Sequence, residues 1–136
     1  MTSSVVRWSI AALCLSACGA DARYIVIGSA RAPSSSGFVE ADEADGGAAV
    51  TLHMQHLHPP ASVEEGITQY VAWFQGPGGQ PVRAGALKYN PEERTGDLVA
   101  HAPFLEFTVK VTAERDATPL TPSATVIASQ SVRIED

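Results

Sequence analysis

Apolar and polar residues alternate along several short segments of this chain, and no segment shows the three-to-four-residue apolar spacing of an amphipathic helix. The clearest segment is 104–113, whose two sets are Leu105, Phe107, Val109 and Val111 against Glu106, Thr108, Lys110 and Thr112. Because successive side chains of a strand point to opposite faces, this pattern predicts one face in the core and one in water. Residues 48–55 alternate in the same way behind Asp45-Gly46-Gly47, which predicts a hairpin with 37–41.

Further strands are predicted between turns rich in Gly and Pro. The segment 68–75 is apolar on both faces, as in a central strand, and ends at Gly76-Pro77-Gly78-Gly79, the expected hairpin tip. A return strand is predicted at Val82–Tyr89, a short strand at 96–101 and a long strand at 123–134. A possible edge strand lies at 24–30, where the sequence alone does not decide between strand and tether. About seven short strands without crossover helices predict an all-β fold, an immunoglobulin-like antiparallel β-sandwich. Since the Cys…Trp…Cys pattern of antibody domains is absent, the expected domain is similar in architecture to fibronectin type III modules.

The N-terminal segment has the pattern of an export signal. Arg7 precedes an apolar stretch that ends at Leu15-Ser16-Ala17-Cys18, and roughly ten apolar residues are too few to cross a bilayer core. This ending resembles the lipobox of bacterial lipoproteins. The resemblance implies that residues 1–17 are a signal peptide removed during processing and that Cys18 becomes the acylated N-terminus. The alternative is an ordinary cleaved signal that ends at Ala17 and leaves Cys18 as an unmodified thiol.

The resemblance also implies a location. Acyl chains on the sulfur and on the amine of Cys18 would bury methylenes worth about 0.8 kcal/mol each, which makes attachment to a membrane effectively permanent. Gly19, rather than Asp, follows the cysteine, and in proteobacterial lipoproteins this resembles an outer-membrane destination. We therefore expect a lipid-anchored protein of the bacterial cell envelope, on the outer membrane.

Processing would leave 119 of the 136 residues, enough for one domain. The expected organisation is a signal at 1–17, a lipidated tether with the possible edge strand at 18–36, and the sandwich at 37–136. Cys14 leaves with the signal and Cys18 carries the lipid, so no cysteine pair remains for a disulfide. The formal net charge of −6 becomes about −7 without Arg7, which argues against nucleic acid as a partner.

One histidine cluster has side chains that bind metals. Its members are His53, Met54, His56 and His58, and imidazole together with thioether suits copper or zinc. On an extended strand, however, His53 lies opposite the other two histidines, while Met54 is needed to continue an apolar face. Surface histidines, with Leu57 in the core, are the favoured interpretation. A bulge near Gln55 would be required to rearrange the cluster.

The acidic residues favour a structural interpretation. The run Glu40–Gly47 has oxygen ligands suited to calcium but lacks the spacing of an EF-hand loop, so it is interpreted as a solvated hairpin. Neighbouring carboxylates point apart, so Glu64-Glu65 and Glu92-Glu93 are assigned to solubility rather than to acid–base chemistry. Gly76–Gly79 lacks the Lys and the helix of a phosphate loop.

No nucleophile motif is present, and we expect no catalytic residues, no enzymatic activity and no cofactor. A hydrolase would need a pocket in which a histidine and a carboxylate lie within hydrogen-bond reach. Four aromatic residues, Tyr70, Trp73, Phe74 and Tyr89, suggest either a stacking platform for a ligand or packing in the core, and packing is favoured, most strongly for Trp73.

The sequence therefore predicts a non-catalytic lipoprotein that serves as a binding or envelope-assembly module. Its expected partners are the membrane, through the anchor, and an envelope protein or a glycan. Loops at one end of the sandwich or an open sheet edge are the expected binding surfaces. The alternative is a periplasmic copper- or zinc-binding protein that uses His53, Met54, His56 and His58.

Overall fold

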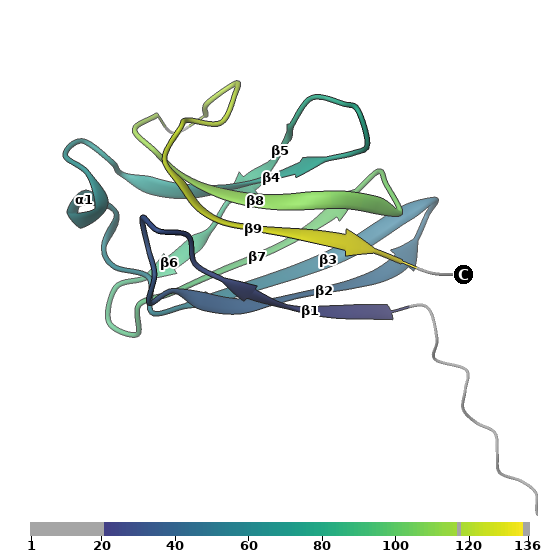
Figure 1. Ribbon diagram of the computed structural model, residues 1–136, viewed down its shortest axis with the longest axis horizontal. Coiled ribbons are helices and arrows are strands. Elements are labelled where there is room, and N and C mark those ends of the chain that lie inside the picture. The colour runs from purple at the N-terminus through teal and green to yellow at the C-terminus, as the bar shows by residue number, and fades with distance from the viewer. Residues whose placement is uncertain (1–20, 117, 135–136) are drawn as a thin grey trace, which may run out of the picture.

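The computed structural model describes residues 21–116 and 118–134, which form two packed β-sheets (Figure 1). The elements in chain order are β1 (Asp21–Ile27), β2 (Ser36–Ala44), β3 (Gly47–Gln55), the short helix α1 (Pro60–Val63), β4 (Gln69–Gln75), β5 (Val82–Ala86), β6 (Lys88–Asn90), β7 (Thr95–Ala102), β8 (Glu106–Glu114) and β9 (Val126–Arg133). One sheet has the order β1-β2-β3-β7-β6 and the other the order β5-β4-β8-β9. All their pairings are antiparallel, which confirms the predicted sandwich.

The core lies between the inner faces of the two sheets, because alternate residues of each strand point inward. Its members include the apolar sets predicted from alternation, Val50, Leu52 and Met54 on β3 and Phe107, Val109 and Val111 on β8. Leu57 also reaches this core, as expected. The four-stranded sheet adds Tyr70 and Phe74 from β4, and the Phe74 ring meets the Phe107 ring edge-on with centroids 5.3 Å apart.

The hairpin between β2 and β3 forms where it was predicted. Asp45 and Gly46 connect the strands with positive φ angles of 51° and 80°, and Ala44 pairs with Gly47 on either side of them. Two consecutive positive φ values belong to the tight turn that matches the twist of a hairpin. Gly37 is required further along the hairpin, since a Cβ there would lie 1.9 Å from the carbonyl oxygen of His53.

β4 is a central strand with both faces covered, as predicted. Trp73 lies outside the core cluster, on the outer face, yet only 1% of its surface is exposed. Its Nε1 donates a hydrogen bond of 2.9 Å to Oγ1 of Thr112 on β8. Thr112 and Glu114 are buried here, so the prediction of a wet face along the whole of 104–113 is wrong at Thr112. The alternation gives the face of a residue but does not show what covers that face.

The prediction of one return strand over Val82–Tyr89 is also wrong. β5 pairs with β4 in the four-stranded sheet, whereas β6 pairs with β7 in the five-stranded sheet. The chain changes sheets at Leu87, whose side chain is buried and whose N–H donates to the carbonyl of Tyr70 at 2.9 Å. With this division, the described part of the chain contains nine strands.

β1 is an edge strand of the five-stranded sheet and begins three residues before the expected segment 24–30. It pairs with β2 over its full length. Beyond Ile27 the chain turns to the other sheet, where Gly28 bridges Ala128 and the N–H of Ser29 donates to the carbonyl of Ile127 at 2.7 Å. The first strand therefore closes one side of the sandwich, between β2 and β9 (Figure 1).

Candidate functional site

The structure places the three histidines of the predicted cluster in three different settings. His53 lies on the outer face of β3, which ends two residues later at Gln55. His56 is exposed and has a left-handed backbone with φ of 58°. Nδ1 of His58 lies 3.2 Å from a guanidinium nitrogen of Arg94. Because arginine can only donate, Nδ1 of His58 is the acceptor, and a positive charge faces the lone pair of this ring nitrogen.

The backbone of 56–58 has a structural task instead. Three consecutive carbonyl oxygens each accept a side-chain hydroxyl: His56 from Ser35 at 3.0 Å, Leu57 from Tyr89 at 2.7 Å and His58 from Tyr70 at 2.5 Å. These bonds hold the segment in which the chain passes from β3 in one sheet to β4 in the other. Sequence reasoning considered the side chains of this segment and overlooked its carbonyl groups.

The described residues contain no group of three or more His, Cys, Asp or Glu side chains arranged to hold a metal ion. Met54, the thioether of the predicted cluster, is fully buried in the core. The structure thus does not bring the candidate metal residues together.

A histidine–carboxylate pair that sequence reasoning missed lies on the outer face of the five-stranded sheet. Nδ1 of His53 and Oδ1 of Asp97 are 2.5 Å apart, because the register of β3 with β7 sets these two residues directly opposite. Nδ1–H donates to the carboxylate, which leaves Nε2 directed away from Asp97. The Phe38 ring stacks beside the imidazole with centroids 5.4 Å apart. Only the strand register, which the sequence does not give, could have revealed the pair.

His53 of this pair lines a shallow hollow of about 370 Å³ together with Ile25, Ser36 and Gln55. Ser36 Oγ is 3.5 Å from Nε2 of Gln55, and among the described residues no hydroxyl is hydrogen-bonded to the imidazole of His53. The hollow thus has an oriented base but no nucleophile joined to it. Its chemistry is that of a small, mainly apolar depression whose polar side chains are His53, Ser36 and Gln55.

Of the acidic residues, Glu64 has a role that the sequence did not indicate. Its carboxylate accepts hydrogen bonds from Arg115 at 2.8 Å, from Arg31 at 3.1 Å and from Thr125 at 3.2 Å. The Arg115 hydrogen bond, followed by those of Arg31 and Thr125, lowers the pKa of Glu64 below its ordinary value. The Glu64 clamp, defined as these four residues, ties together three loops at the α1 end of the sandwich. Glu92 and Glu93 lie in the predicted polar turn, where both N–H groups donate to the Asn90 side chain.

The aromatic residues pack, as favoured from the sequence. Tyr70, Trp73 and Phe74 are buried, and the rings of Tyr70 and Tyr89 lie 5.9 Å apart. Burial, and then the neighbouring Tyr89, raises the pKa of Tyr70 to about 12. Burial also raises the pKa of Tyr89. These residues form no open stacking platform.

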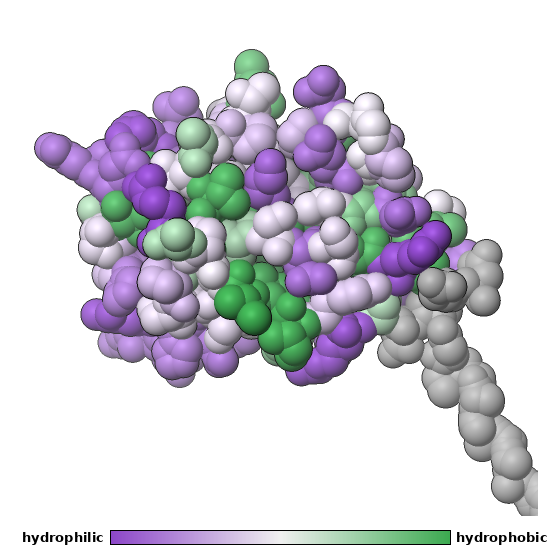
Figure 2. Space-filling model, viewed as in Figure 1, coloured by the Kyte–Doolittle hydropathy of each residue, from purple (hydrophilic) through white to green (hydrophobic). Residues whose placement is uncertain are grey.

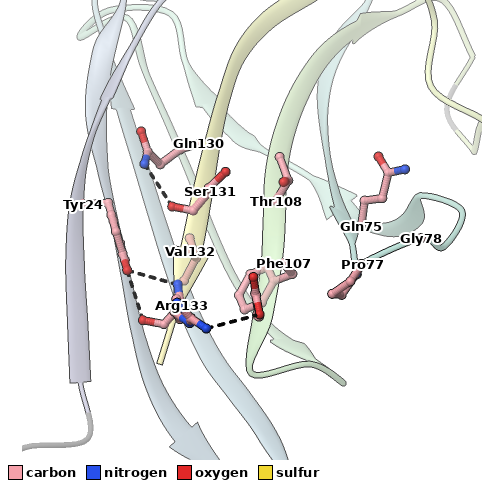
Figure 3. A pocket seen from close by; sticks show the side chains of 12 residues that line it. Tyr24, Gln75, Pro77, Gly78, Phe107, Thr108, Gln130, Ser131, Val132 and Arg133 are labelled. Atoms are coloured by element: carbon pink, nitrogen blue, oxygen red, sulfur yellow. Dashed lines mark hydrogen bonds and ion pairs between the residues drawn. The ribbon is translucent and has the colours of Figure 1, made fainter. Parts of the chain in front are cut away.

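A hollow on the described surface runs across the edge of the four-stranded sheet (Figure 3). We call it the β9 groove; it has a volume of about 660 Å³. Its lining is Tyr24 from β1, Gln75 to Gly78 from β4 and its hairpin tip, Glu106 to Thr108 from β8, and Gln130 to Arg133 from β9. Across the outer face of this sheet, Gln75 pairs with Thr108 and Thr108 pairs with Ser131. The floor is therefore a row of neutral hydrogen-bonding side chains.

The charged side chains and the backbone groups at one end of the groove already have partners. Glu106 and Arg133 face each other across β8 and β9 with 4.0 Å between their charged atoms. The Tyr24 hydroxyl contacts both the N–H and the C=O of Arg133 (Figure 3). The side-chain amides of Gln75 and Gln130 already donate to the carbonyls of Gly79 and Ser131. Their amide oxygens and the hydroxyls of Thr108 and Ser131 line the groove beside the rings of Tyr24 and Pro77. This combination suits a neutral polar ligand, such as a peptide main chain or sugar hydroxyls.

Comparison with known proteins adds no family. No protein-family model matches the chain, and no curated protein matches it. Within residues 21–116 and 118–134, no helix is long and apolar enough to cross a membrane. The predicted lipobox, Leu15 to Cys18, lies outside the described residues.

Proposed function

We propose that this protein is a lipid-anchored, non-catalytic binding module of the bacterial cell envelope, held on the outer membrane by acylated Cys18. The observation that carries the proposal is the ending Leu15-Ser16-Ala17-Cys18 directly ahead of a β-sandwich that contains no cysteine. Only two residues separate Cys18 from the first described residue of β1, Asp21. A thiol in this position has no disulfide partner in the folded domain, which supports modification of Cys18 over a structural disulfide.

The β9 groove is the proposed binding surface. It has a volume of about 660 Å³, and its polar groups are neutral except for the Glu106–Arg133 pair. An envelope protein chain or a glycan would find hydrogen-bonding partners in Gln75, Thr108 and Ser131. Recognition of this kind requires no charge on the ligand and no metal.

The anchor is tested by metabolic labelling with an alkyne fatty acid, followed by intact mass measurement and detergent phase partitioning. The wild-type protein and a Cys14→Ser control should both incorporate label and enter the detergent phase. Cys18→Ser should abolish the label and the partitioning, because it removes the thiol that forms the thioether. A mature wild-type chain that begins at Cys18 without added acyl mass would contradict the proposal.

The groove is tested by titrating isotope-labelled Cys18→Ser protein with soluble peptidoglycan fragments, which carry both sugar hydroxyls and peptide groups. Saturable amide shifts should occur at Thr108 and Ser131, while Thr51 on the opposite sheet should not move. Shifts confined to other surfaces would remove the groove as the binding site.

A further inference from the structure

The outer face of the five-stranded sheet carries an unusual share of exposed apolar surface. Ile25 is 66% exposed, Ile27 is 70% exposed and Val99 is 75% exposed, and these are three of the five large apolar residues that are exposed in the described part. The strand register puts all three on this face, with Phe38 directly beside Ile25. Figure 2 shows hydrophobic surface gathered over β1. We call Ile25, Ile27 and Phe38 the β1 patch.

Two carboxylates of this face, Glu40 and Asp97, have hydrogen-bond partners beside the β1 patch. Arg23 lies 2.7 Å from Glu40 and 4.1 Å above the Phe38 ring. Asp97 is paired with His53 on the far side of the same ring. Pairing lowers the cost of bringing these groups close to an apolar surface, because neither carboxylate faces that surface alone. The long stem of Arg23 adds apolar area while its guanidinium can remain at a polar boundary.

The chain length between Cys18 and β1 limits where this face can be. From Cys18 to Asp21 the chain advances three residues, so a fully extended connection spans at most about 11 Å. Ile25 and Ile27 follow on the same strand. A tether this short holds the patch at a high effective concentration over the lipid surface, so that even a weak contact becomes populated.

We propose, resting on the lipid anchor proposed above, that the outer face of the five-stranded sheet lies on the bilayer that holds Cys18, with Ile25 and Ile27 entering the lipid interface. Apolar side chains on a surface element are stabilised at this depth by leaving water, and zwitterionic lipid avoids repulsion of the acidic chain. The four-stranded sheet and the β9 groove then face away from the membrane, toward a partner.

The contact is tested by placing a photoreactive benzophenone amino acid at position 27 of the acylated protein. The protein is reconstituted into vesicles of phosphatidylcholine and phosphatidylethanolamine, irradiated and analysed by mass spectrometry. The matched control carries the same amino acid at position 120, since Leu120 is 93% exposed but lies in the loop before β9. Position 27 should form lipid adducts with at least a fivefold higher yield than position 120. A second variant carries the probe at position 25 and should also form lipid adducts, which controls for a local structural change caused by the probe at position 27.

Equal lipid yields at positions 27 and 120 would overturn the proposed contact. Cross-linked dimers at position 27 without lipid adducts would overturn it as well and would assign the β1 patch to a second copy of this chain. The mass of Cys18 in the same samples reports on the anchor separately. If Cys18 is not acylated by the cell, the proposed function fails, and the contact is then measured after coupling a maleimide phospholipid to Cys18 of the purified chain.

Discussion

The hydroxyl of Tyr24 donates to the carbonyl of Arg133 and accepts from its N–H, both at 3.0 Å, although the two residues are 109 positions apart. One side chain from the edge of one sheet thereby occupies both backbone groups at the edge of the other. Near the opposite end of β9, Ser29 donates two hydrogen bonds, from its hydroxyl to the carbonyl of Val126 and from its N–H to the carbonyl of Ile127. Unpaired edge groups invite other strands to add, so these contacts protect β9 from unspecific pairing.

Tyr24→Phe should therefore destabilise the domain and promote self-association. Loss of the hydroxyl leaves the N–H and C=O of Arg133 without this partner, and we expect a loss of about 1–2 kcal/mol in the free energy of unfolding. Urea denaturation measures the first effect, and sedimentation velocity over a range of concentrations measures the second. A variant that is as stable and as monomeric as the wild type would show that solvent serves Arg133 equally well.

Thr112→Val should be more costly than its modest change in shape suggests. The Thr112 hydroxyl accepts from Trp73 and donates to Glu114 at 2.5 Å, and all three side chains are buried. The variant leaves the indole N–H without its partner and removes one of two hydrogen bonds to Oε2 of Glu114, which keeps the one from the N–H of Ser123. We expect a cost of about 1–3 kcal/mol. Thr108→Val, on the same face of β8 but half-buried, is the control and should cost less. Equal losses in urea denaturation would argue against the buried chain of hydrogen bonds as the cause.

Glu64→Gln should remove a pH-dependent part of the stability. The pKa of Glu64 is lowered in the folded state, chiefly by the hydrogen bond from Arg115. Its contribution is therefore fully present above the unfolded pKa, about 4.5, and is lost as the pH falls through the lower folded value. The variant should be less stable than the wild type at pH 7 and should approach it in acid. Glu65→Gln controls for the loss of one charge; a difference for Glu64→Gln that persists unchanged in strong acid would contradict the clamp.

Tyrosine ionisation should reveal the burial of Tyr70. Its pKa is raised to about 12 from the ordinary 10.0, mainly by burial. Its contribution to stability is thus present below the unfolded pKa and is lost between pH 10.0 and about 12. Phenolate absorbance should show a late transition that is missing in Tyr70→Phe, while denaturant should merge the transitions. The same late transition in Tyr70→Phe would assign it to Tyr89 instead.

The sequence predicted the elements that depend on local pattern. The hairpin at Asp45-Gly46, the central strand at 68–75 and the apolar face of Leu52 and Val109 all follow from alternation and turn chemistry, which act over a few residues. The architecture followed as well, because short strands with tight turns have few ways to bury one face.

The features that the sequence did not predict depend on strand register or on which side chains pack over a sheet face. The His53–Asp97 pair exists because β3 and β7 align in one register, and a shift of one residue would place His53 in the core. Thr112 is buried because Trp73 packs against it, which alternation alone does not show. The residues that line the β9 groove come from β1, β4, β8 and β9, so no contiguous sequence motif predicts it.

The passage of the chain from one sheet to the other at Leu87 couples the folding of the two sheets. β5 and β6 are separated by this single residue yet belong to different sheets. Unfolding of either sheet would displace a strand of the other through this short connection. We therefore expect that neither sheet folds independently. Melting should accordingly be a single all-or-none event, with the slowest-exchanging amides of both sheets opening together.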